Sequence, residues 1–188
     1  MNKLVNLYES SAFFLIALCV FLLDQLSKIH IEATLAYQQS RPLWEPFLYL
    51  TYVRNQGAAF SLLWGHGNIL SLIGLAVVSV VVVVHWRSRP TGPLYTLAAG
   101  LLVGGAIGNM YDRFTLGYVR DMVDLHWAGR NVFPIWNVAD MAVVGAVGLF
   151  ILFSSWMETQ RQAFTASDAS PAPLAPAGAS ELSSETMP

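Results

Sequence analysis

The sequence is short of charge. Only 12% of its 188 residues are Asp, Glu, Lys or Arg, whereas 55% are hydrophobic. Soluble domains carry about 25% charged residues, so this composition excludes an ordinary soluble domain and indicates a membrane protein. The net charge of −2 gives no reason to expect nucleic acid as a partner.

Cysteine and clustered metal ligands are also scarce. Cys19 is the single cysteine, so a disulfide within the chain is impossible, and its place in an apolar stretch predicts a packing residue rather than a nucleophile. No Ser–His or Cys–His arrangement is evident. The four histidines are scattered, without the spacing of metal ligands, at His30, His66, His85 and His126. We therefore expect no metal and no cofactor.

Four apolar stretches are long enough to cross a bilayer, which takes about 20 mostly apolar residues. The first is too long, and too polar at its end, for a cleaved signal peptide, so we interpret it as a retained span. The predicted spans cover about residues 11–31, 69–86, 94–110 and 138–156. The sequence therefore predicts an all-α integral membrane protein with four transmembrane helices.

The orientation of these spans follows from their short loops. Four spans place both termini on one side, and the tight loop "HWRSRP" on that side carries Arg87 and Arg89. Positively charged short loops are retained in the cytoplasm. More Lys and Arg residues fall on the opposite side, but several lie beside acids, as Lys28 lies near Asp24, and pairing explains them better. We expect both termini in the cytoplasm.

The longest connection, about residues 33–67, joins the first two spans. Its segment "PFLYLTYVRN" is rich in the aromatic and β-branched residues that favour a strand, and "NQG" after it favours a turn. We expect a small sheet or hairpin on the outer membrane surface. Residues 1–162 then form the membrane domain, and the Ala/Ser/Pro-rich residues 163–188 are predicted to be a disordered cytoplasmic tail.

The third predicted span carries a stripe of small residues. Gly100, Gly104 and Gly108 recur every four residues, so they lie on one helix face and allow another helix to approach closely. The fourth span offers plausible counterparts in Ala142, Gly145 and Ala146.

Ionisable residues near these spans need an explanation, because a charge at mid-bilayer costs about 2.5–3.5 kcal/mol. Asp24 and Lys28 in "DQLSK" share a helix face, either as an ion pair or as residues that support a site. In "GNMYDR", Asp112 and Arg113 form a structural pair with their neighbours, or Asp112 turns inward together with Asn109.

The carboxylates around the fourth span suggest chemistry. Asn137 is a natural N-cap, and Asp140 falls at the third helical position, where free N–H groups and the helix dipole favour a carboxylate. Capping alone explains this pair. Asp121, however, lies on the return from the third span and can reach the same level. Two adjacent carboxyl groups, one protonated and one ionised, can activate water and protonate a leaving nitrogen.

Five motifs occur in a fixed order along the chain: "DQLSK" at 24–28, "NQGAAF" at 55–60, "GNMYDR" at 108–113, "VRDMVD" at 119–124 and "WNVAD" at 136–140. In their order and spacing they resemble the prolipoprotein signal peptidase (signal peptidase II) family of four-span bacterial aspartic peptidases. The resemblance covers nearly the whole chain up to about Trp156. On these motifs the catalytic dyad falls on Asp121 and Asp140. The substrate-binding or site-supporting positions fall on Asp24, Lys28, Asn55, Gly57, Asn109, Asp112, Arg113 and Asn137.

The resemblance also implies a setting and a substrate. It implies a multi-pass protein of the bacterial inner membrane, in contact with lipid, whose site faces the periplasm beneath a β-rich cradle formed by residues 33–67. It implies cleavage of diacylglyceryl-modified prolipoproteins before the lipidated cysteine, and sensitivity to globomycin. We expect a monomer. Three residues depart from the family pattern: Trp136 replaces a usual Phe, and Arg120 and Met122 stand where apolar residues are more typical.

Other function classes fit parts of the pattern. Asp121 and Asp124 could ligate Mg²⁺ in a membrane phosphoalcohol or prenyl transferase, which a chelator would inhibit. A proton-coupled transporter could use intramembrane acids as a relay, but acids gathered at one face give no path across the bilayer. A purely structural membrane protein would need only the capping and pairing roles.

Overall fold

The computed structural model describes residues 3–57, 67–88 and 92–168. The chain divides into two compact units, Met1–Phe153 and Ser154–Pro188. The helices are α1 (Lys3–Thr34), α2 (Gly67–Ser88), α3 (Pro93–Leu116) and α4 (Val138–Asp168).

Three helices are long and apolar enough to cross a membrane. These segments are Glu9–Thr34, Gly67–Arg87 and Pro93–Leu116, in agreement with the first three predicted spans. The apolar stretch found in α4 among the described residues is shorter, Val138–Leu152, so the fourth span stays a prediction. The predicted domain boundary at residue 162 falls inside α4, which continues to Asp168. Residues 169–188 of the predicted tail lie outside the described residues.

The glycine stripe of α3 packs against α1. A Cβ atom on Gly104 would lie 2.5 Å from the carbonyl oxygen of Ala17, and one on Gly100 would lie 2.7 Å from Ile16 Cγ2. No larger residue fits at these distances without a shift of the helices, so the stripe lets the two backbones approach closely.

The predicted pairing of that stripe with the fourth span is wrong for Gly100 and Gly104. Helix α4 approaches α3 at a different residue, Gly105, where an added Cβ would lie 2.5 Å from the carbonyl oxygen of Ala139. Gly145, one of the predicted counterparts, faces open space within the described part of the chain.

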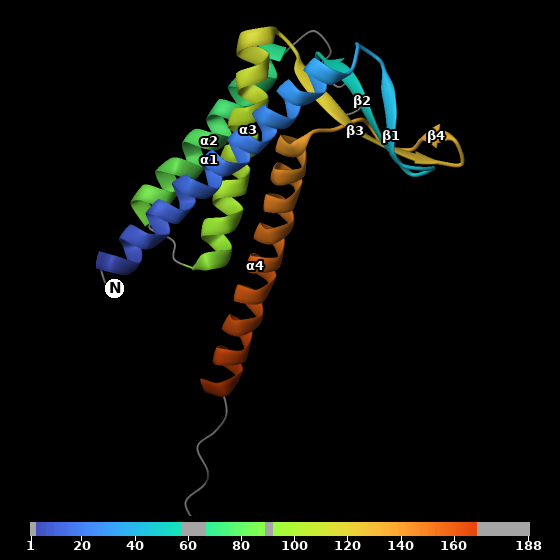
Figure 1. Cartoon of the computed structure of the whole chain (residues 1–188). Helices are drawn as coiled ribbons and strands as arrows, with labels where there is room; N and C mark the ends of the chain where they lie inside the picture. The colour runs from blue at the N-terminus through green and yellow to red at the C-terminus, as the bar shows by residue number, and fades with distance from the viewer. Residues whose placement is uncertain (1–2, 58–66, 89–91, 169–188) are drawn as a thin grey trace, which may run out of the picture. The chain divides into compact units, whose positions relative to one another are not determined.

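A four-stranded antiparallel sheet lies at one end of the first unit (Figure 1). Its strands, in spatial order, are β1 (Ser40–Trp44), β2 (Leu48–Asn55), β3 (Val119–Trp127) and β4 (Arg130–Asn131). The β1–β2 hairpin confirms the sheet expected from the first connection. The other two strands, β3 and β4, come from the segment between α3 and α4. The connection between the first two helices therefore supplies only part of the sheet, whereas the sequence predicted the whole cradle there.

Register and packing fix the sheet to the helices. Asn55 of β2 pairs with Val119 of β3, and Val53 pairs with Asp121. Helix α3 ends at Gly117, whose φ of 80° is the left-handed cap conformation that glycine adopts easily, and β3 starts two residues later. A buried cluster then joins the end of α1 to the sheet through Ile31, Leu35, Tyr52 and Met122.

Candidate active site

The side chain of Asn137 connects the two predicted catalytic acids. Its Nδ2 donates to Asp121 Oδ1 at 2.6 Å, and its Oδ1 accepts from the backbone N of Asp140 at 2.9 Å. The backbone N of Asn137 lies 3.3 Å from Asp140 Oδ2, so the two residues cap each other reciprocally and the predicted capping pair is confirmed. Asn137 therefore both caps α4 and links Asp121 to Asp140.

Two further asparagines donate hydrogen bonds to the acids. Asn55 Nδ2 donates to Asp121 Oδ2 at 2.9 Å, and Asn109 Nδ2 donates to Asp140 Oδ1 at 2.7 Å. The Oδ1 atom of Asn55 accepts from the backbone N of Gly57 at 2.9 Å, which shapes the turn after β2. The structure thus brings β2, β3, α3 and the start of α4 to one centre.

A buried ion pair lies behind this centre. Lys28 Nζ is 2.8 Å from Asp24 Oδ2 and 3.3 Å from Asp112 Oδ2, and it donates to Asn109 Oδ1 at 3.0 Å. Asp24 Oδ1 also accepts from the backbone N of Ala139 at 2.9 Å. The predicted pair of Asp24 and Lys28 is confirmed, and it ties α1 to the first turn of α4. Its role in supporting a site stays a prediction.

Asp112 and Arg113 point to different partners. Asp112 is fully buried and turns inward, where its Oδ1 lies 2.7 Å from Arg120 Nη2. The Nη2 atom of Arg113 donates to the carbonyl oxygen of Gly57 at 3.1 Å, and its Nη1 lies 3.4 Å from the carbonyl oxygen of Asn109. The inward orientation of Asp112 with Asn109 is confirmed. Arg113 spans from α3 to the turn after β2.

Asp121 and Asp124 do not form a common site. Side chains alternate along a strand, so positions 121 and 124 of β3 lie on opposite faces. Asp124 accepts from Thr51 Oγ1 at 2.7 Å and from Asn131 Nδ2 at 2.5 Å, and His126 Nε2 lies 3.0 Å from its Oδ1. The described residues contain no group of three or more His, Cys, Asp or Glu side chains placed to hold a metal ion. The Mg²⁺-binding pair considered from the sequence is therefore not assembled.

The environment of Asp121 perturbs its titration. The residue is 1% exposed, and burial is the largest cause that raises its pKa to about 7. The negative charge of Asp140 raises the pKa further, while the hydrogen bonds from Asn55 and Asn137 and the charge of Lys28 lower it. Asp121 is thus a carboxyl group that holds its proton close to neutral pH.

Sequence reasoning assigned no role to three polar residues of the network that contains Asp112. The Arg120 guanidinium contacts Gln25 and Glu32 of α1 in addition to Asp112. Positions 25, 28 and 32 follow the three- and four-residue spacing of one helix face, and this pattern could have identified Gln25 and Glu32. Arg120 stands out in the sequence only as a departure from the family pattern, without a role.

The fold is that of bacterial membrane enzymes. It matches a bacterial membrane enzyme solved by the in meso method at 2.3 Å resolution with a TM-score of 0.73 and 30% identity, over 80% of this chain and 91% of that one. A second such enzyme, solved at 1.9 Å, matches with a TM-score of 0.68 and 32% identity, over 76% of this chain and 91% of that one.

Within that class, residues 16–156 match the family described as signal peptidase (SPase) II, and the chain belongs to this family. The lipoprotein signal peptidase of Halothermothrix orenii is 36% identical over 140 residues, which cover 74% of this chain and 92% of that protein. The lipoprotein signal peptidase of Moorella thermoacetica is 38% identical over 72% of this chain and 87% of its own. That of Syntrophomonas wolfei is 43% identical over 55% and 69%.

Proposed function

We propose that this protein is an aspartic endopeptidase of the bacterial inner membrane that removes the signal peptide from diacylglyceryl-modified prolipoproteins. Cleavage takes place before the lipidated cysteine. Family membership and the lipoprotein signal peptidases among its relatives support the substrate. The observation that carries the proposal is the pair Asp121 and Asp140, joined through Asn137 where β3 meets the start of α4.

In the proposed reaction the two acids have opposite roles. Asp140 takes a proton from water while the water oxygen attacks the carbonyl carbon of the scissile amide, and Asp121 gives its proton to the carbonyl oxygen. The tetrahedral intermediate then collapses and the C–N bond breaks. Asp140 passes its proton to the leaving nitrogen, and Asp121 recovers a proton from the oxygen. The products are a carboxylic acid and a free amine, and one water is consumed.

The proposed topology follows from the substrate. A diacylglyceryl group keeps its acyl chains in the bilayer, so the scissile bond is presented near the membrane surface rather than in free solution. We place the dyad and the sheet on the periplasmic side and both termini in the cytoplasm. The support is positive charge around the short connection from α2 to α3, where Arg87 lies in the last turn of α2 and Arg89 follows the helix in the sequence. We further propose that the enzyme works as a monomer and is inhibited by globomycin.

The test is direct cleavage. The purified full-length protein in detergent or lipid should convert a diacylglyceryl-prolipoprotein to a form that begins with the lipidated cysteine, as read by mass spectrometry. The same precursor without its lipid serves as the matched control and should remain intact. A correctly folded protein that leaves the lipidated precursor unchanged would exclude the proposal.

Chelation should leave this activity intact. The proposed reaction uses one water and two carboxyl groups, so neither EDTA nor extensive dialysis should change the rate of cleavage by more than about twofold. The measurement is the initial rate before and after treatment, with added Mg²⁺ as a control. Loss of activity in EDTA that Mg²⁺ restores would favour the transferase-type chemistry of a metal site instead.

Cleavage should decline as pH rises through about 7. Asp121 must carry a proton in order to donate it, and with a pKa of about 7 it is protonated below that pH and loses the proton above it. The descending limb of kcat/KM against pH reports this group in the free enzyme. A profile that stays flat from about pH 6 to about pH 8 would assign proton donation to another group.

A further inference from the structure

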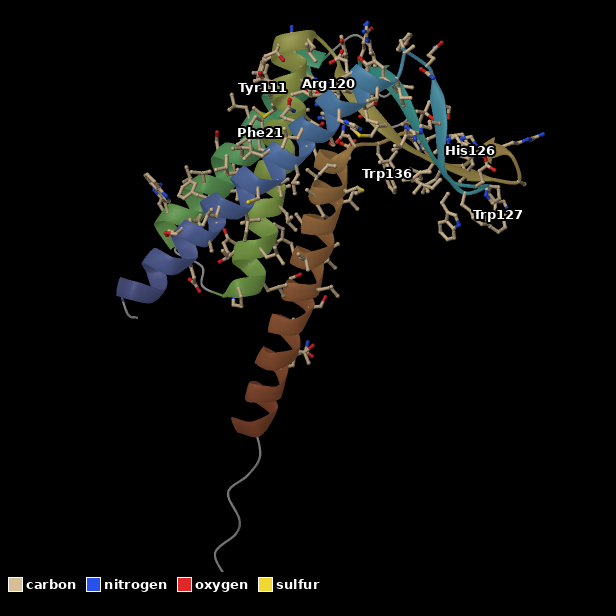
Figure 2. All side chains as sticks on the ribbon, in the orientation of Figure 1. Phe21, Tyr111, Arg120, His126, Trp127 and Trp136 are labelled. Atoms are coloured by element: carbon tan, nitrogen blue, oxygen red, sulfur yellow. The ribbon has the colours of Figure 1, made fainter. Side chains whose placement is uncertain are left out.

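Arg120 connects three elements that meet beside the proposed dyad. Figure 2 shows it where β3 meets the ends of α1 and α3. Toward α3, its Nη2 and Nε lie 2.7 Å from Oδ1 and 3.2 Å from Oδ2 of Asp112, and its backbone N donates to the same Oδ2 at 3.0 Å. Toward α1, its Nη2 donates to Gln25 Oε1 at 2.9 Å and its Nη1 to Glu32 Oε2 at 3.1 Å.

This set of contacts is more than a surface ion pair. Arg120 is 5% exposed and Asp112 is fully buried, so solvent and salt screen these contacts much less than those of an exposed pair. A guanidinium presents its donors in a planar fork, and here the fork holds a carboxylate on α3 and an amide on α1 at once. The start of β3 is thereby fixed against both helices.

Arg120 is also linked to both acids of the dyad. It precedes Asp121 in the chain, and its carbonyl oxygen lies 3.4 Å from Nδ2 of Asn137, the atom that donates to Asp121. On the other side Asp112 pairs with Lys28, and Lys28 donates to Asn109, the residue that donates to Asp140.

We propose that Arg120 is a positioning residue for the peptidase reaction, which fixes the strand that carries Asp121 relative to the helix start that carries Asp140. This inference rests on the proposed function. It assigns a role to a residue that stands where apolar residues are more typical of the family. Arg120 acts through its neighbours and does not contact the scissile bond.

The test compares Arg120→Gln with Arg54→Gln. Arg54 is the cross-strand partner of Arg120 in the sheet, but it is exposed, and its guanidinium lies over the rings of Tyr37, Tyr52 and Tyr118. The two variants therefore change the same residue type at paired positions. We expect Arg120→Gln to lower kcat about tenfold with KM within about twofold, since small misplacement of reacting groups is costly. Arg54→Gln should keep both constants within about twofold.

Arg120→Lys keeps the charge but loses the fork, so it should recover only part of kcat. It also guards against a folding defect in the glutamine variant. A folded Arg120→Lys or Arg120→Gln protein with the parental kcat, or a loss confined to KM, would overturn the inference. The amount of folded protein is measured by the size-exclusion peak and the thermal midpoint. If kcat falls only in proportion to that amount, the inference is overturned as well.

A second readout does not depend on cleavage. The infrared carbonyl band of protonated Asp121, identified by its absence in Asp121→Asn, can be titrated in each variant. If Arg120 positions the strand, its loss admits water to Asp121, and the titration midpoint falls from about 7 toward the ordinary range. An unchanged midpoint, or a rise as expected from removing a nearby positive charge, overturns the positioning role. If the parental protein fails to cleave the lipidated precursor, the proposed function is excluded. The infrared titration still tests the positioning role of Arg120 in that case.

Discussion

Asp121→Asn and Asp140→Asn should each reduce cleavage to near background, and the double variant should be scarcely worse than either single one. A positioned acid or base contributes about 10²–10⁴-fold, so two independent groups would lose roughly the product of their effects. These two acids instead activate one water and share the same amide link, because Asn137 contacts both. Groups that work as a unit show strongly non-additive losses.

The measurement is the initial rate on lipidated precursor, with each variant checked for membrane insertion and folding. Asp124→Asn is the matched control, because it changes the same residue type three positions along β3, where Thr51 and Asn131 hold the side chain away from the dyad. It should retain measurable activity. An inactive Asp124→Asn beside an active Asp121→Asn would show that the wrong carboxylate of β3 has been assigned.

The first three membrane helices were predictable because length and apolarity define them locally. The β1–β2 hairpin was predictable for the same reason, since its aromatic and β-branched residues favour a strand. Strand β3 was missed, and the reason lies in its sequence. "VRDMVDLHW" carries two aspartates, a residue type that is depleted in strands. Asp121 is stabilised here by Asn55 and Asn137, and Asp124 by Thr51 and Asn131. Local propensity includes none of these partners, which come from other segments of the chain.

The residues of the site also divide into those that the sequence identified and those that it did not. The residues of the five motifs were identified by their order along the chain, and the structure brings Asp121, Asn137 and Asp140 together as expected. The contacts of Arg120 could not be identified by spacing, since its partner Gln25 is 95 residues away. A buried arginine is stable only when its donors are satisfied, and its acceptors become visible only when three separate elements are placed in space.

Substitutions of Asn137 should have the second large effect on cleavage. They can also separate its two functions, capping α4 and holding Asp121. Asn137→Ala removes the oxygen that caps α4 and the nitrogen that donates to Asp121. Loss of an N-cap costs about 0.5–2 kcal/mol of stability. Loss of the contact with Asp121 leaves the carboxyl free to shift relative to Asp140, and such misplacement can cost about 10²-fold in kcat.

Asn137→Ser separates the cap from the contact. A serine hydroxyl can accept from the backbone N of Asp140 and preserve the cap, but it does not supply the second, directed donor that the amide gives to Asp121. We therefore expect the thermal midpoint of Asn137→Ser to lie near that of the parent, while its kcat stays close to that of Asn137→Ala. Asn137→Asp also keeps a capping oxygen, but it places a carboxylate against Asp121 and should be equally inactive. Thermal unfolding and kcat, measured together on the three variants, decide the matter. A serine variant that recovers full activity along with stability would show that capping alone is what the reaction requires of Asn137.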